Sequence, residues 1–273
     1  MKKSKFKNET NGVFPNENYF ERARLNALLK NAIDYPLIIV CAGSGYGKTQ
    51  AVTSFLQQFE AQTVWLQITE RDNIPTRFWE SYSNQVSLLG PKFGARLKEI
   101  GFPKTDAALA KCVTARRAVA ELPGKHIRVF DHCHLLRDPE VLRFLEWAVN
   151  TPLSNLTVIL ITRSMPEINL VGMMMRGLVF TIQEDMLRFT EDEIAKYFNQ
   201  LKLPATRDDI RNISEDTQGW AFAINLIGRS LSKERKYERY ALEAMKKIFS
   251  GLSRWKFQEL FPGRCCVFCC VFR

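Results

Sequence analysis

A segment near the N-terminus carries small, basic and hydroxyl side chains at a spacing that suits phosphate binding. It reads Ala42-Gly43-Ser44-Gly45-Tyr46-Gly47-Lys48-Thr49, which is a small residue, four free positions and then Gly-Lys-Thr. The glycines leave room for a backbone to wrap a phosphate. Lys48 would reach the β- and γ-phosphates of a nucleotide, and the Thr49 hydroxyl would hold Mg²⁺. The predicted cofactor-binding residues are Gly43, Ser44, Gly45, Tyr46, Gly47, Lys48, Thr49 and Gln50.

The residues on either side of this loop predict a strand before it and a helix after it. Residues 36–41 form an apolar run that is typical of a buried parallel strand. Residues 50–59 carry apolar side chains at helical spacing. The loop is therefore expected at a strand-to-helix turn, where the free N–H groups of the helix point at an anion.

A second candidate group follows another predicted strand, residues 126–131, which ends in Asp131. In P-loop proteins such a strand delivers a carboxylate to the Mg²⁺ shell, so Thr49 and Asp131 are the predicted metal site. Hydrolysis usually needs a further acid beside it to orient the attacking water, but the next residue is His132. Nucleotide binding is therefore better supported than turnover. Two further acids, Glu70 and Asp72, are distant alternatives.

Strand-like and helix-like segments alternate through the first two thirds of the chain. This alternation predicts an α/β fold, a P-loop NTPase parallel sheet with helices on both faces. Ligands of such sheets bind at the carboxyl ends of the strands, where Asp131 and Arg163 fall. The predicted strands are residues 36–41, 62–68, 126–131, 156–162 and 178–183, and the predicted helices are near residues 18–34, 48–60, 75–89, 105–121 and 138–150.

The pattern changes after about residue 187. A capping box, Thr190-Glu191-Asp192-Glu193, precedes an amphipathic helix, and two more helices are expected from Arg207 and from Gly219. This predicts a small helical domain after the sheet. The expected domains are a flexible basic arm (1–16), a P-loop ATPase domain (17–187), a helical lid domain (188–250) and a truncated or frameshifted tail (251–273).

Composition narrows the class of protein. The chain has 273 residues, 46% of them hydrophobic, and a formal charge of +10. The longest apolar stretches are strand-sized and no apolar segment follows the basic N-terminus, which favours a cytoplasmic protein with no membrane partner. Residues 229–264 hold ten basic and four acidic side chains, but no helix-turn-helix pattern accompanies them, so sequence-specific DNA binding is not expected.

The seven cysteines fall into two groups. Three occupy predicted core or near-core positions, as expected of reduced thiols: Cys41, Cys112 and Cys133. The other four lie in the last nine residues, 265–273. A frameshift or truncation is the simplest explanation of that tail; zinc binding and acylation of the cysteines are the functional alternatives.

Taken together, the motifs resemble those of LuxR-type, maltose-regulon-activator-like transcription regulators. These are signal-transduction ATPases with a nucleotide-oligomerisation module. The resemblance covers residues 20 to about 235. Besides the P-loop it rests on Arg22, Arg24 and Leu25, Val64-Trp65-Leu66, Asp72-Asn73-Ile74-Pro75, Arg77-Phe78-Trp79, Asp131-His132-Cys133-His134, Leu160-Ile161-Thr162-Arg163-Ser164-Met165-Pro166, Phe189-Thr190-Glu191-Asp192-Glu193 and Gly219-Trp220-Ala221-Phe222-Ala223-Ile224.

The resemblance implies a cofactor and a set of residue roles. The cofactor is ATP or ADP with Mg²⁺, and ATP with an inducer favours self-association. Arg163 matches the sensor arginine that faces the γ-phosphate, so the implied catalytic residues are Asp131, His132 and Arg163. His134 matches the histidine that ends the family's Asp-Asp-x-His run. His132 stands where the family has a second acid, which predicts slow or absent hydrolysis.

Family members are several times longer and carry inducer-sensing repeats and a DNA-binding helix-turn-helix. The leading hypothesis is therefore a truncated ATP-binding switch module that lacks both. In the family Trp220 lies in the helical domain that covers the nucleotide, and Ala221 replaces a proline near the adenine. The alternatives are a stand-alone P-loop ATPase with a basic nucleic-acid-associating tail and a pseudogene product without a stable fold.

Overall fold

The structure, a computed structural model, describes residues 20–89, 91–121 and 123–233. The chain divides into two compact units, Met1–Leu187 and Arg188–Arg273. The predicted basic arm, most of the basic cluster and the cysteine-rich tail lie outside the described residues. No helix within the described ranges is long and apolar enough to cross a membrane.

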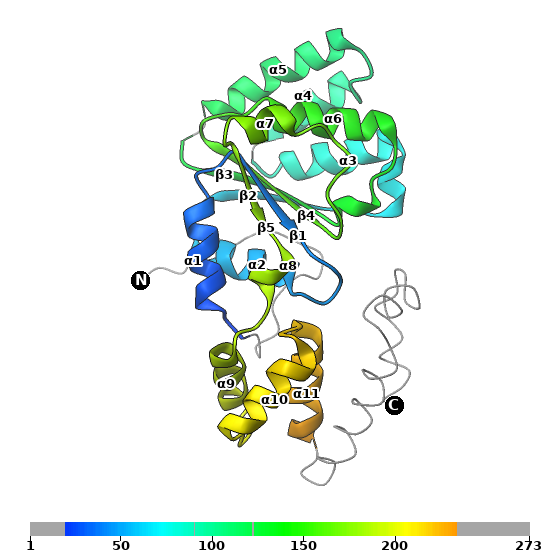
Figure 1. Ribbon diagram of the computed structural model, residues 1–273. Coiled ribbons are helices and arrows are strands. Elements are labelled where there is room, and N and C mark those ends of the chain that lie inside the picture. Colours follow the sequence, from blue (N-terminus) through cyan, green and yellow to red (C-terminus); the bar gives the residue numbers. More distant parts are fainter. Residues whose placement is uncertain (1–19, 90, 122, 234–273) are drawn as a thin grey trace. The chain divides into compact units, whose positions relative to one another are not determined.

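The first unit is built on a parallel sheet of five strands (Figure 1). The strands are β1 (Leu37–Cys41), β2 (Gln62–Gln67), β3 (His126–Asp131), β4 (Leu156–Thr162) and β5 (Val179–Ile182). Their order is β2-β3-β4-β1-β5, and all neighbours are parallel. The predicted α/β fold with a parallel sheet is confirmed, and the five predicted strands match the observed ones to within one residue at each end.

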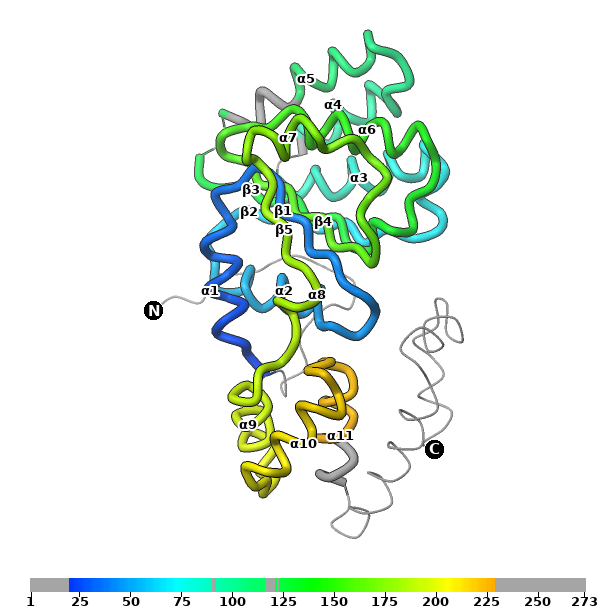
Figure 2. The backbone as a smooth tube through the Cα atoms, in the orientation of Figure 1, coloured from blue at the N-terminus to red at the C-terminus, as the bar shows by residue number. Residues whose placement is uncertain are grey.

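Helices cover both faces of the sheet. Figure 2 shows α1 and α2 on one side and α3 and α6 on the other. The helices of this unit are α1 (Ala23–Ala32), α2 (Lys48–Gln58), α3 (Pro75–Val86), α4 (Pro91–Ile100), α5 (Asp106–Ala120), α6 (Pro139–Asn150), α7 (Val171–Met175) and α8 (Glu184–Leu187). Two 3₁₀ turns, η1 (Glu70–Asn73) and η2 (Cys133–Leu135), follow β2 and β3.

Three of these helices were not predicted: α4, α7 and α8. Gly94 and the neighbouring Pro91 weaken the helical pattern of α4, although proline is tolerated in the first turn. Packing favours glycine at position 94, because a Cβ there would lie 1.6 Å from Ser87 Oγ. The other two, α7 and α8, have only five and four residues, too few to show a period.

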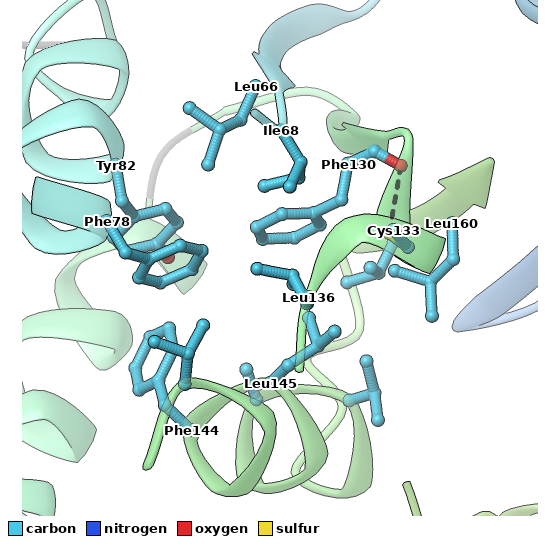
Figure 3. Close-up of a cluster of buried hydrophobic side chains, with 14 of the residues drawn as sticks. Leu66, Ile68, Phe78, Tyr82, Phe130, Cys133, Leu136, Phe144, Leu145 and Leu160 are labelled. Carbon is cyan, nitrogen blue, oxygen red and sulfur yellow. Dashed lines mark hydrogen bonds between the residues drawn. The ribbon is translucent and has the colours of Figure 1, made fainter. Parts of the chain in front are cut away.

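The core on the α3–α6 face is rich in aromatic side chains (Figure 3). Phe78 from α3 is fully buried, and its ring centroid lies 5.8 Å from that of Phe144 on α6. Phe130 comes from β3, and its carbonyl accepts a hydrogen bond of 3.2 Å from the buried Cys133 thiol. The turn that follows β3 is thereby fastened to the core.

The second unit begins with the predicted capping box. Thr190 Oγ1 accepts from the Glu193 N–H at 3.2 Å, and the Glu193 carboxylate accepts from the Thr190 N–H at 3.1 Å. The box opens α9 (Glu191–Gln200), which is followed by α10 (Arg207–Thr217) and α11 (Ala221–Lys233). Gly219 precedes α11 with φ +71° and sits so close to the Phe189 carbonyl that a Cβ would approach its oxygen to 2.6 Å.

The α3–α4 contact yields a test of the packing. Gly94→Ala should lower the free energy of unfolding by about 1 to 3 kcal/mol, because the new methyl group overlaps Ser87 and the Ser83 carbonyl. Gly172→Ala in α7 is the matched control, since nothing lies within 4 Å of its added Cβ; it should be neutral or stabilising. Urea unfolding of both variants measures the difference, and equal stability would contradict the packing.

Candidate nucleotide-binding site

The loop between β1 and α2 has the backbone that phosphate binding requires. Gly45 and Gly47 have φ values of +78° and +76°, a region that glycine enters without steric cost. Gly47 is also the N-cap of α2, and no side chain caps this helix end. The N–H groups of the first turn are therefore not engaged by a cap and can face an anion.

Lys48 is folded back onto its own loop. Its ammonium group donates to the carbonyls of Ala42 at 2.8 Å and Gly43 at 2.7 Å. Burial, followed by the positive charge of Arg163, lowers the pKa of Lys48 to about 8. The ammonium group is thus held by two neutral carbonyls in a site that disfavours its positive charge. An anion bound beside Lys48 would stabilise that charge.

Thr49 and Asp131 lie side by side, as the sequence analysis expected. The Thr49 hydroxyl is 3.0 Å and 3.2 Å from the two carboxylate oxygens of Asp131. Asp131 is 1% exposed, and burial raises the pKa of its carboxyl group against the opposing effects of His132, the Thr49 hydrogen bond and Lys48. A hydroxyl and a carboxylate oxygen are hard donors of the kind that Mg²⁺ prefers, so these two residues fit that cation.

His132 follows Asp131 in a left-handed conformation, with φ +63°. Its N–H donates to Asp131 Oδ1 at 2.9 Å, and its Nε2 lies 4.0 Å from the same oxygen. A histidine at positive φ is uncommon, and Asn and Asp are the other residues enriched there. The backbone therefore brings the imidazole back toward the Asp131 carboxylate.

His134 lies on the same turn, with its ring centroid 5.8 Å from that of His132. Its Nδ1 is buried and has no hydrogen-bond partner. Burial lowers the pKa of His134 to about 4, with further contributions from Arg163, His132, Lys48 and Arg137. The imidazole is therefore neutral at physiological pH.

Arg163 and Gln50 complete the set of residues predicted for the site. Arg163 directly follows Thr162, which pairs with Cys41 at the start of the loop. Its side chain is exposed, and its charge reaches both Lys48 and His134. Gln50 lies in the first turn of α2, and its amide nitrogen is buried without a hydrogen-bond partner. Within the loop Tyr46 is buried and Ser44 is exposed.

One residue that shapes this site appears in the sequence analysis only within the Asp72-Asn73-Ile74-Pro75 motif, without a role of its own. Asn73 lies in η1, and its Nδ2 donates to the Leu135 carbonyl at 2.8 Å. Its Oδ1 accepts from the Arg137 N–H at 2.6 Å and from the Asp138 N–H at 3.0 Å. Asn73 therefore ties the turn after β2 to the turn that carries His132 and His134. Spacing could not reveal this, because the partners are backbone groups more than sixty residues away.

The two distant acids do not stand in for the missing carboxylate. Asp72 is buried, and its carboxylate accepts from the N–H and the hydroxyl of Thr69, both at 2.7 Å. It is therefore committed to capping η1. Glu70 is exposed in the first turn of η1.

The sequence is similar to part of known transcription regulators. No protein-family model matches the chain. It is 24% identical over 246 residues to the HTH-type transcriptional regulator MalT of Klebsiella pneumoniae strain 342, a match that covers 89% of this chain and 27% of the regulator. It is 25% identical over 214 residues to MalT of Cronobacter sakazakii, a match that covers 77% of this chain and 23% of that regulator. The chain thus spans between 23% and 27% of the length of these relatives.

Two solved structures show the same fold. The Walker-type ATPase PABY2304 of Pyrococcus abyssi superposes with a TM-score of 0.55 at 18% identity, covering 91% of this chain and 78% of that one. The second is PH0952 of Pyrococcus horikoshii, a signal-transduction ATPase with numerous domains and a tetratricopeptide-repeat sensor. It superposes with a TM-score of 0.57 at 14% identity, and the match covers 86% of this chain and 33% of that one. In fold the chain is a P-loop NTPase, and in sequence it is similar to the P-loop ATPase part of MalT regulators.

Proposed function

We propose that this chain binds ATP or ADP with a divalent cation and serves as the nucleotide-dependent switch module of a transcription regulator. The observation that carries this is the Thr49–Asp131 pair, 3.0 Å apart, beside a P-loop whose lysine donates to two carbonyls of its own loop. The similarity to MalT regulators supports the regulatory context. That the chain is a truncated fragment stays a prediction.

Each residue of the site has a separate part in binding. The first turn of α2 presents backbone N–H groups to the phosphates. Lys48 leaves the carbonyls of Ala42 and Gly43 and pairs with the phosphate charge. Thr49 and Asp131 would hold a divalent cation, which would neutralise phosphate charge. In this proposal Arg163, which is exposed and follows the strand beside the loop, contacts the outermost phosphate.

We expect this site to bind ATP but to hydrolyse it slowly. The acid that usually orients the attacking water would stand next to Asp131, but His132 occupies that position. Its backbone N–H is bonded to Asp131 and its ring lies 4.0 Å from the same carboxylate. We therefore assign the chain slow hydrolysis, consistent with a switch that persists in its ATP state. Self-association in that state is part of this proposal.

Nucleotide binding should raise the melting temperature. A ligand at one hundred times its Kd stabilises the native state by about 2.7 kcal/mol, which for a chain of this size corresponds to roughly 5 to 10 °C. Differential scanning fluorimetry with ADP and Mg²⁺ measures this shift. Lys48→Ala should abolish most of it, and an equal shift in that variant would rule out the phosphate role of Lys48.

ADP affinity should fall as the pH rises above 8. The pKa of Lys48 is about 8 in the free protein, and bound phosphate favours the protonated form, so nucleotide affinity is fully present below that pKa and is lost above it. Between pH 7 and pH 9 the loss should be about tenfold. Calorimetry on Lys48→Arg is the control, because a guanidinium stays protonated. If the ADP affinity of Lys48→Arg declined similarly with pH, a group other than Lys48 would be the one that titrates.

The wild-type chain should hydrolyse ATP slowly, and His132→Asp should accelerate hydrolysis by about tenfold or more, because it restores a carboxylate beside Asp131. His132→Asn is the matched control: it also tolerates positive φ but supplies no carboxylate, so its rate should not rise. Phosphate release under single- and multiple-turnover conditions measures both. Rapid multiple turnover in the wild type would instead favour a stand-alone ATPase.

A further inference from the structure

Asn73 joins two turns that follow neighbouring strands. Strands β2 and β3 are paired along their whole length, and the turns η1 and η2 come after them. Asn73 Nδ2 donates to the Leu135 carbonyl at 2.8 Å, and its Oδ1 accepts from the Arg137 N–H at 2.6 Å and the Asp138 N–H at 3.0 Å. A side-chain amide suits this position because it both donates and accepts hydrogen bonds.

The backbone that carries Asn73 is itself fixed to the end of β3. The Asp72 carboxylate accepts from the N–H and the hydroxyl of Thr69, both at 2.7 Å, and so caps η1. Just before this turn the Ile68 N–H donates to the Asp131 carbonyl at 2.9 Å. The Asn73 side chain can therefore act as a fixed support for the turn that follows Asp131.

The turn that Asn73 holds is the one that orients the Asp131 carboxylate. The His132 N–H donates to Asp131 Oδ1 at 2.9 Å, and the Thr49 hydroxyl donates to the same carboxylate. The His132 carbonyl accepts from the Leu135 N–H at 3.0 Å, and the Leu135 carbonyl accepts from Asn73. A path of hydrogen bonds and backbone therefore runs from the Asn73 side chain to the carboxylate.

This turn needs support because His132 has a left-handed backbone, with φ +63°. Such a conformation is costly for a residue other than glycine, and it persists only where the surrounding structure fixes it. At the start of the turn the Cys133 thiol donates to the Phe130 carbonyl (Figure 3). Asn73 supplies its three hydrogen bonds at the far end of the turn, so its loss would release that end.

We propose that Asn73 is a positioning residue of the cation site: it fixes the turn after β3 so that the Asp131 carboxylate stays directed at Thr49. The inference rests on the nucleotide and cation binding proposed above. Mg²⁺ requires its oxygen ligands in near-ideal geometry, so a displaced carboxylate weakens cation binding more than phosphate binding. Asn73 therefore sets the cation affinity of the nucleotide-bound chain and leaves cation-free ADP binding unchanged.

The first test needs no ligand. Amide hydrogen exchange, followed by NMR on the full chain, reports whether the His132 N–H is still held. Asn73→Ala should accelerate exchange of this N–H about tenfold, the effect expected from loss of one hydrogen bond. Asn150→Ala is the matched control and should leave this exchange unchanged. Asn150 Nδ2 donates to the carbonyls of Glu146 and Asn169, both at 2.9 Å, at the opposite end of α6.

The second test measures the cation dependence of binding. A fluorescent ADP analogue reports binding while Mg²⁺ is titrated. Asn73→Ala should raise the half-saturating Mg²⁺ concentration about tenfold, the low end of the range for residues that orient a metal ligand through hydrogen bonds. Its ADP affinity without Mg²⁺ should equal that of the wild type. Asn150→Ala should change neither quantity, although both variants lower the melting temperature; a role confined to stability moves the melting temperature alone.

Unchanged His132 exchange in Asn73→Ala, or an unchanged half-saturating Mg²⁺ concentration while ADP still binds, would each overturn the inference. If this variant does not fold, Asn73→Asp decides: it keeps the two bonds that Oδ1 accepts but loses the bond donated to Leu135, and it should still accelerate His132 exchange. Absence of Lys48-dependent ADP binding would overturn the proposed function, whereas the exchange measurement would still decide whether Asn73 holds the turn.

Discussion

The hydrogen bond between the Thr49 hydroxyl and the Asp131 carboxylate joins segments that lie 82 residues apart in the chain. The sheet decides whether these residues meet. Strands β1 and β3 are separated by β4, and both Val40 and Asp131 pair with Ile161 of that strand. A slip of one residue in β3 would turn Asp131 to the other face of the sheet. The buried side chains that set the register of β4 therefore also assemble the site.

The electrostatics of the site favour an anion. Burial lowers the pKa of Lys48 and of His134, and the positive charge of Arg163 lowers both further, whereas the charge of Asp131 raises the pKa of Lys48. Such an arrangement is costly in the free protein and is relieved by phosphate groups, which carry several negative charges. The left-handed backbone at His132 belongs to the same site and brings the imidazole to within 4.0 Å of the Asp131 carboxylate.

Sequence patterns were sufficient for the sheet and for the phosphate-binding loop. Strands β1 and β4 are mostly apolar runs, and the Gly-Lys-Thr motif has a physical meaning that is independent of the rest of the fold. The patterns failed where packing decides. Gly94 looks like a helix breaker, but it is the residue that lets α4 approach α3. Asn73 looks like an ordinary loop residue, but it fastens two turns through backbone groups that no side-chain pattern records.

The central claim is that Thr49 and Asp131 act as one cation site for a bound nucleotide. A double-mutant cycle with Thr49→Val and Asp131→Asn tests it, with ADP affinity measured by calorimetry in the presence and absence of Mg²⁺ or Mn²⁺. Each single variant should lose the cation-dependent part of the affinity, and the double variant should lose no more than either one. Additive losses, or cation dependence that survives in both single variants, would contradict the account.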